Sequence, residues 1–129
     1  MSAKKALVVD DMNSMRMLVS KAVKEMGYEV IAAKDGMEAW EKLIEHAGEI
    51  TFVISDWTMP NWTGLELLKN VRRDPRVSNM PFLMLTAEAE AAQVKEAIEA
   101  KVDAYIRKPF TPAIIREKVE QVLAKKAAA

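Results

Sequence analysis

The chain contains no cysteine, so disulfide bonds, thiolate metal ligands and a cysteine nucleophile are all excluded. It has no excess charge, because 19 basic residues balance 19 acidic ones, and nucleic acid or an anionic membrane surface gains no support as a partner. The single histidine, His46, lies near the end of a charged helical segment, and we interpret it as a solvated surface residue. The first apolar run, at residues 6–9, is far shorter than a signal-peptide core or a membrane span. We therefore expect a cytoplasmic protein.

Half of the 129 residues are hydrophobic, which is enough to build one globular domain with a real core. We expect a single domain over residues 1–129, with its core within about residues 5–125. Short apolar runs rich in β-formers predict five strands, at residues 6–9, 30–33, 52–54, 82–85 and 104–106.

The segments between and after these runs carry helical periodicity. Apolar residues recur at spacings of three and four from residue 15 to a stop at Gly27, and again over residues 39–47, 65–71, 91–98 and 115–123. Thr111 is expected to cap the last helix, with Pro112 in its first position. Strict alternation of strand and helix predicts an α/β fold with a five-stranded parallel sheet and helices on both faces. We expect the strand order 2-1-3-4-5, the flavodoxin-like arrangement.

Polar side chains collect where the predicted strands end. Asp10 and Asp11 follow the first strand, Asp56 closes the third, Thr86 closes the fourth, and Lys108 follows the fifth. Ligands of open α/β sheets bind outside the carboxyl ends of the strands, where the strand order reverses, and the order 2-1-3-4-5 puts that point between the first and third strands. Three carboxylates in one cleft repel each other, and a hard divalent cation relieves that repulsion. We therefore predict a Mg²⁺ site at Asp10, Asp11 and Asp56.

Thr86 and Lys108 extend this prediction from metal binding to phosphoryl transfer. Such a transfer needs a nucleophile, cations that neutralise the phosphoryl oxygens, and a hydrogen-bond donor. We predict that Asp56 attacks as a carboxylate, that Mg²⁺ and Lys108 each carry one phosphoryl oxygen, and that the Thr86 hydroxyl donates to another. The product would be an acyl phosphate.

Each of these residues also has a purely structural interpretation. Residues 10–14 could cap the first helix, and Asp56 could shape a turn. Thr86 could be an ordinary strand residue or the N-cap of the fourth helix, and Lys108 could be a solvated loop charge. Together these interpretations require four unrelated roles to meet at one edge of the sheet, which favours a functional site.

Five segments of the sequence hold these residues in a characteristic order and spacing. They are Val8-Val9-Asp10-Asp11, Ile54-Ser55-Asp56-Trp57-Thr58-Met59-Pro60, Gly64-Leu65-Glu66-Leu67-Leu68, Leu85-Thr86-Ala87-Glu88 and Lys108-Pro109-Phe110. With them, essentially the whole chain resembles the receiver domains of two-component response regulators, above all the single-domain chemotaxis regulators.

The resemblance implies a role for each site residue. Asp56 would be the phosphoacceptor, and Asp10 and Asp11 the acidic metal pair. The backbone carbonyl of Thr58 would complete the Mg²⁺ shell, and Lys108, preceding a cis proline bond, would bind the phosphoryl group. The implied donor is a phosphohistidine on a sensor histidine kinase. The chain would be a self-phosphorylating and slowly self-dephosphorylating switch rather than an enzyme with turnover.

The resemblance also implies an output surface. Phosphorylation would draw Thr86 toward the phosphoryl group and turn Tyr105, in the fifth strand, inward. The face of the fourth helix, fifth strand and fifth helix would then bind a downstream protein, with the flagellar motor switch as the chemotaxis target. The expected contact positions are Glu88, Glu90, Tyr105 and Lys118. We expect a monomer without nucleic-acid or membrane partners.

Several segments depart from the pattern of the family, among them Trp62-Thr63-Gly64, Glu90-Ala91 and the connection that leads into the fifth strand. Lys101-Val102 stands where relatives usually place Gly-Ala, between the fourth helix and the fifth strand. We expect this connection to lack the left-handed helix cap that glycine favours and to be strained or to continue as helix.

Two other functions compete with the switch. A small Mg²⁺-dependent phosphatase with an aspartyl nucleophile needs a second aspartate two residues after the first, where this chain has Thr58. A docking module that is never phosphorylated would be expected to have lost the acidic pair or the lysine, and both are present.

Overall fold

The structure is a computed structural model that describes residues 4–87 and 91–128. Five strands alternate with five helices: β1 (Lys5–Val9), α1 (Asn13–Glu25), β2 (Glu29–Ala33), α2 (Gly36–Glu45), β3 (Ile50–Asp56), α3 (Gly64–Arg73), β4 (Phe82–Thr86), α4 (Ala91–Glu99), β5 (Ala104–Arg107) and α5 (Pro112–Ala128). All neighbouring strands are parallel, and the sheet has the order β2-β1-β3-β4-β5. The predicted fold class and strand order are therefore confirmed.

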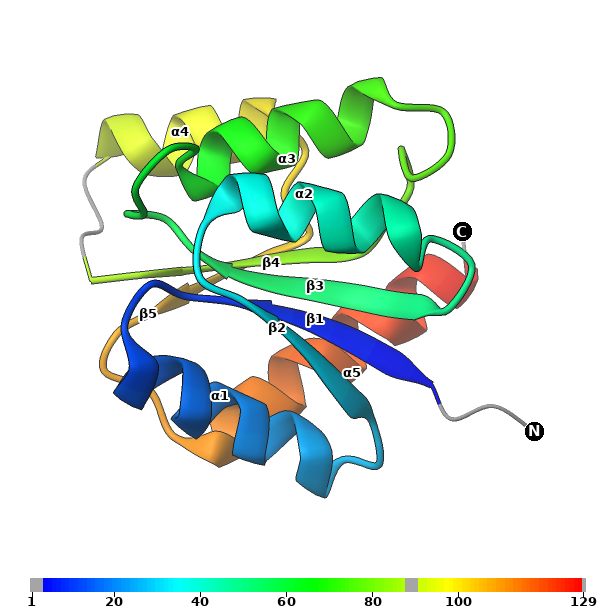
Figure 1. Cartoon of the computed structure of the whole chain (residues 1–129). Helices are drawn as coiled ribbons and strands as arrows, with labels where there is room; N and C mark the ends of the chain where they lie inside the picture. The colour runs from blue at the N-terminus through cyan, green and yellow to red at the C-terminus, as the bar shows by residue number, and fades with distance from the viewer. Residues whose placement is uncertain (1–3, 88–90, 129) are drawn as a thin grey trace.

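The helices cover both faces of the sheet and create two cores. Helices α2, α3 and α4 lie on one face, and α1 and α5 lie on the other (Figure 1). Because side chains alternate across a strand, Val53 and Phe52 of β3 enter different cores. The first core contains Leu43, Leu67 and Leu68, and the second contains Val19, Ile115 and Val119.

Strands β3 and β4 are buried where they approach the site. All residues of β4 are buried, as are residues 52–56 of β3. Parallel pairing sets Val9 beside Ser55, Asp56 beside Leu85 and Thr86 beside Arg107, so the carboxyl ends of four strands finish at the same edge. No helix within the described residues is long and apolar enough to cross a membrane.

Two helices end in the same backbone motif, although only one of them uses glycine. After α1, Gly27 adopts a φ of 98°, its N–H donates to Lys24 O at 2.9 Å, and the next N–H donates to Val23 O. After α4, Lys101 adopts a φ of 66°, with its N–H on Ile98 O and the N–H of Val102 on Ala97 O, both at 3.0 Å. Both are Schellman caps. The expectation that the cap is absent at Lys101 was wrong, because lysine takes the left-handed conformation itself.

The start of α5 follows the sequence prediction. Pro112 is its first residue, and the Ile114 N–H donates to the Thr111 hydroxyl oxygen at 3.2 Å. Helix α3 begins with a reciprocal capping box between Thr63 and Glu66. These caps fix where the loops from β3 and β5 enter their helices, and both loops border the edge where the polar residues collect.

Candidate functional site

Three carboxylates meet at the carboxyl edge of the sheet. Asp10 and Asp11 follow β1 and Asp56 ends β3, and one oxygen from each lies within 4.8 Å of the others. Asp10 is completely buried, Asp56 is 7% exposed, and Asp11 is exposed. Such a group of oxygen ligands with one face open to solvent suits a hard divalent cation that retains some of its water.

Asp10 is held by the backbone that follows it. Its Oδ1 accepts the Met12 N–H at 2.9 Å, whereas its Oδ2 is buried and accepts no hydrogen bond from the described residues. Burial raises the pKa of Asp10, the Met12 N–H opposes this rise, and the Asp56 carboxylate adds to it. The N-cap of α1 is Met12, which makes no side-chain cap hydrogen bond, so neither Asp10 nor Asp11 is the N-cap of this helix.

Asp56 is held by one backbone donor and one cation. Its Oδ1 accepts hydrogen bonds from the backbone N–H of Trp57 at 3.0 Å and from the Lys108 Nζ at 3.1 Å. Burial raises the pKa of Asp56, and the Lys108 ammonium counters that effect. Both donors therefore reach the same carboxylate oxygen, Oδ1.

Lys108 lies against the acidic cluster and is not a fully solvated loop charge. It is half-buried, and its Nζ lies 3.8 Å from Asp10 Oδ2 as well as 3.1 Å from Asp56 Oδ1. Its backbone N–H donates to Thr86 O at 2.7 Å, which fixes the chain after β5 against the end of β4. The Lys108–Pro109 bond is cis, as the resemblance implied.

The remaining predicted residues divide by location. Thr86 is the buried last residue of β4 and not the N-cap of α4, which begins at Ala91. Thr58 is exposed in the loop after β3. Half-buried Tyr105 packs on the core from β5, and half-buried Lys118 lies on α5. Glu88 and Glu90 lie outside the described residues.

A clasp that could not be predicted from the sequence joins the start of α2 to the loop after β3. Asp35, the buried N-cap of α2, accepts the Glu38 N–H at 2.8 Å through Oδ1 and the Asn61 Nδ2 at 3.1 Å through Oδ2. Asn61 has a φ of 67° and lies in the same loop as Thr58. A proline followed by asparagine signals such a turn, but nothing in the sequence pairs Asn61 with a residue 26 positions earlier.

The end of β3 also packs directly against the start of α3. The Gly64 N–H donates to Trp57 O at 2.8 Å. A Cβ atom at Gly64 would overlap the Asp56 carbonyl oxygen and the Met84 sulfur. Glycine at this position therefore lets α3 start against the residue that carries the central carboxylate.

A doubly wound parallel sheet with buried carboxylates at its switch point and a lysine facing them is the arrangement of a receiver domain. Residues 6–120 match the family described as the response regulator receiver domain, and the chain belongs to that family.

Its relatives include chemotaxis regulators. Chemotaxis protein CheY1 of Helicobacter pylori is 46% identical over 120 residues, which cover 92% of this chain and 96% of that protein. The structure of the chemotaxis response regulator CheY4 of Vibrio cholerae has a TM-score of 0.84 at 35% identity and covers 94% of this chain and 99% of that chain. CheY from Borrelia burgdorferi, solved as a CheX-CheY-BeF3-Mg complex, has a TM-score of 0.85 at 28% identity over 92% of this chain and 88% of that one. The chain is thus a CheY-like receiver domain.

Proposed function

We propose that this chain is a phosphoacceptor switch that takes a phosphoryl group onto Asp56 and reports it through the surface of α4, β5 and α5. The observation that carries the proposal is the meeting of four side chains from three strand ends. The Lys108 Nζ lies 3.1 Å from Asp56 Oδ1, and Asp10 and Asp11 complete the acidic cluster. The family of the chain supports the same function.

The acidic cluster would hold Mg²⁺. The buried Asp10 Oδ2, which lacks a hydrogen-bond donor among the described residues, and the raised pKa of both buried aspartates fit a site that is stabilised by a cation. Asp10, Asp11, Asp56 and the Thr58 carbonyl are the proposed ligands. When bound, Mg²⁺ supplies positive charge to the phosphoryl oxygens. The solved complex of the Borrelia burgdorferi relative, which contains both BeF3 and Mg, supports this assignment.

The proposed transfer uses the chain's own side chains. A carboxylate oxygen of Asp56 forms the new bond to phosphorus, and the bond from phosphorus to the donor's imidazole nitrogen breaks. The leaving imidazole keeps the electron pair and takes a proton from solvent. Lys108 neutralises one phosphoryl oxygen, and the Thr86 hydroxyl donates to another. Water later cleaves the acyl phosphate, so the chain acts stoichiometrically, with a histidine kinase as its donor.

The output would begin at Thr86 and reach the surface through Tyr105. Thr86 Cα pairs with Arg107 in the sheet, and Tyr105 lies two residues before Arg107 on β5. A shift of Thr86 toward the phosphoryl group would open space for the Tyr105 ring and change the face that includes Lys118. A downstream chemotaxis target would bind this face.

Acetyl phosphate with Mg²⁺ tests the proposal directly. The wild-type chain should gain one phosphoryl mass that is stable to acid and labile to base, as seen by intact mass spectrometry. Asp56→Asn should lose this gain. Asp74→Asn removes a carboxylate that pairs with Arg76 away from the site, and this variant should be modified like the wild type. A modification that persists in Asp56→Asn would refute the assignment of the acceptor.

A further inference from the structure

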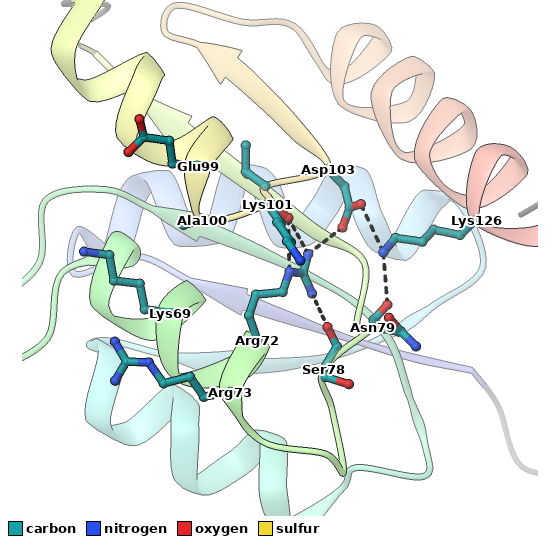
Figure 2. Close-up of a pocket in the computed structure, with 11 residues that line it drawn as sticks. Lys69, Arg72, Arg73, Ser78, Asn79, Glu99, Ala100, Lys101, Asp103 and Lys126 are labelled. Atoms are coloured by element: carbon teal, nitrogen blue, oxygen red, sulfur yellow. Dashed lines mark hydrogen bonds and ion pairs between the residues drawn. The ribbon is translucent and has the colours of Figure 1, made fainter.

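A basic hollow lies near the amino ends of β4 and β5, opposite the carboxyl ends of the strands that carry the acidic cluster. It has a volume of about 580 Å³ and is lined by the ends of α3 and α4, the segments that lead into β4 and β5, and Lys126 of α5 (Figure 2). Five basic side chains line it, against two carboxylates, those of Glu99 and Asp103. The net charge of its lining is therefore positive, although the whole chain is neutral.

Two of the five cations are already used to build the floor of the hollow. Arg72 donates to Lys101 O at 2.9 and 3.0 Å, to Ser78 O at 3.1 Å, to Met80 O at 2.6 Å and to Asp103 Oδ2 at 2.8 Å. Lys126 reaches Asp103 Oδ1 at 3.1 Å. Because these bonds join three segments, the floor is held in one shape, and the carboxylate of Asp103 is neutralised from both sides.

The other three cations have no such use. Lys69 and Arg73 are exposed, lie one turn apart on α3 and extend in the same direction in Figure 2, and Lys101 is exposed on the next wall. In the part of the chain that is described, no carboxylate lies within ion-pair distance of any of the three. Like charges gathered on a concave surface favour an anionic ligand over solvent alone.

The backbone at Lys101 gives a second, independent indication. Its φ of 66° is a left-handed conformation that glycine adopts with little strain and that costs other residues about 1 kcal/mol. The helix cap would therefore form more easily with glycine, and lysine contributes only its side chain to this position. A strained residue that keeps a cation on the rim of a basic hollow indicates a role for that cation.

The hollow favours carboxylates on a flexible segment over a compact phosphate. Phosphate sites commonly use the N–H groups at helix N-termini, whereas α3 and α4 both direct their C-termini here. The carbonyl ends would repel a phosphate placed on the floor. Lysine and arginine side chains extend beyond these carbonyls and can pair with separate carboxylates at the rim. We propose that this hollow docks an acidic segment of a partner protein, which pairs with Lys69, Arg73 and Lys101 and leaves the acceptor cleft free.

Backbone amide NMR of the full chain tests this site with a short peptide of alternating glutamate and glycine. The peptide should shift amides at residues 69–73, 78–79 and 99–103, and the matching glutamine–glycine peptide should not. Lys69→Gln, Arg73→Gln and Lys101→Gly should each weaken binding by about three- to fivefold, the size expected for an exposed ion pair. The matched pair Lys21→Gln and Lys24→Gln, exposed on α1, should leave the affinity unchanged.

Three outcomes would overturn the proposal. The glutamate peptide could produce no localised shifts, the α1 substitutions could weaken binding as much as the hollow substitutions do, or pyrophosphate at equal charge could shift the hollow more strongly than the peptide. Lys101→Gly separates charge from folding, because it should lower affinity while raising stability. Asp56→Asn should bind the peptide normally, so failure of the phosphoacceptor function and failure of this site can be told apart.

Discussion

The rings of Trp57 and Tyr105 meet edge to face, with centroids 6.4 Å apart and planes inclined by 72°. Trp57 directly follows Asp56 and donates its backbone N–H to the Asp56 carboxylate. Tyr105, the other member of the pair, lies in β5. The aromatic pair therefore connects the acidic cluster to the strand proposed to carry the output. Edge-to-face packing fixes the orientation of the rings, so a change at Asp56 should alter the surroundings of both rings.

We expect Mg²⁺ to change the fluorescence of Trp57, because a divalent cation on Asp56 alters the field beside the indole. Titration of the wild-type chain with MgCl₂ should give a saturable change in emission. Asp11→Ala should abolish it by removing a ligand, and Trp57→Phe should remove the signal while Trp40 and Trp62 remain. A wild-type emission that is flat across the titration would count against a metal in this cleft.

Asp10→Asn should stabilise the metal-free chain at neutral pH. The folded state raises the pKa of Asp10, chiefly by burial, so keeping this group ionised costs folding free energy. Asparagine keeps the oxygen that accepts the Met12 N–H and carries no charge.

The advantage of Asp10→Asn should depend on pH with a defined sign. Below the unfolded-state pKa the carboxyl is protonated in both states, and the penalty on the wild type is absent. The penalty grows as pH rises through the raised folded-state pKa and then stays constant. Urea unfolding with a chelator at several pH values measures the difference between the two proteins. A difference that is largest in acid would contradict the assigned cause, and Mg²⁺ should shrink it by stabilising the wild type alone.

The fold could be predicted from the sequence because it depends on patterns that repeat locally. Apolar runs and helical stripes alternate along the whole chain, and parallel strands need long connections, so the order of the elements follows. The acidic cluster and Lys108 were predictable for a related reason, since in a parallel sheet all strands end at the same edge. Thr111 and Pro112 marked the start of α5 through local hydrogen bonding alone.

Lys101 shows where such reasoning fails. A left-handed cap is recognised in a sequence by its glycine, and lysine carries no such signal, yet the hydrogen bonds after α4 match those after α1. The structural role of Arg72 could not be predicted for another reason, because a cation at the end of a helix resembles an ordinary surface residue. Its five hydrogen bonds go to residues at positions 78–103, and only the folded chain brings those partners together.

Lys101→Gly should raise the free energy of unfolding by about 1 kcal/mol, because glycine takes the left-handed conformation with little strain. Lys101→Ala is the matched control, since it removes the same charge and keeps the strain. If both variants had the same midpoint in urea, the conformational cause would be refuted and the change would belong to the charge.

Gly64→Ala should destabilise the chain by about 1–3 kcal/mol, the usual cost of overpacking a buried position. The added methyl would overlap the Asp56 carbonyl oxygen, so Mg²⁺ binding at Asp56 should weaken as well. Gly48→Ala is a fitting control, because a Cβ there meets no atom within 4 Å. Thermal unfolding of the two variants with and without Mg²⁺ compares them, and equal melting temperatures would show that the α3 start can move freely.

The clasp between Asp35 and Asn61 gives the last prediction. Asn61→Gly deletes the amide that donates to Asp35 but keeps a residue that accepts a φ of 67°. The lost hydrogen bond to a carboxylate should lower the free energy of unfolding by about 1.5–3 kcal/mol. Because Thr58 shares this loop, the proposed Mg²⁺ ligand at its carbonyl should also become less ordered, and the Trp57 titration should shift to higher Mg²⁺. Asn79→Gly makes the same chemical change in the segment before β4, outside the loop that holds Thr58, and should leave the titration unmoved. If Asn61→Gly lost stability but bound Mg²⁺ like the wild type, the clasp would support the fold alone and would not be needed to position the Thr58 carbonyl.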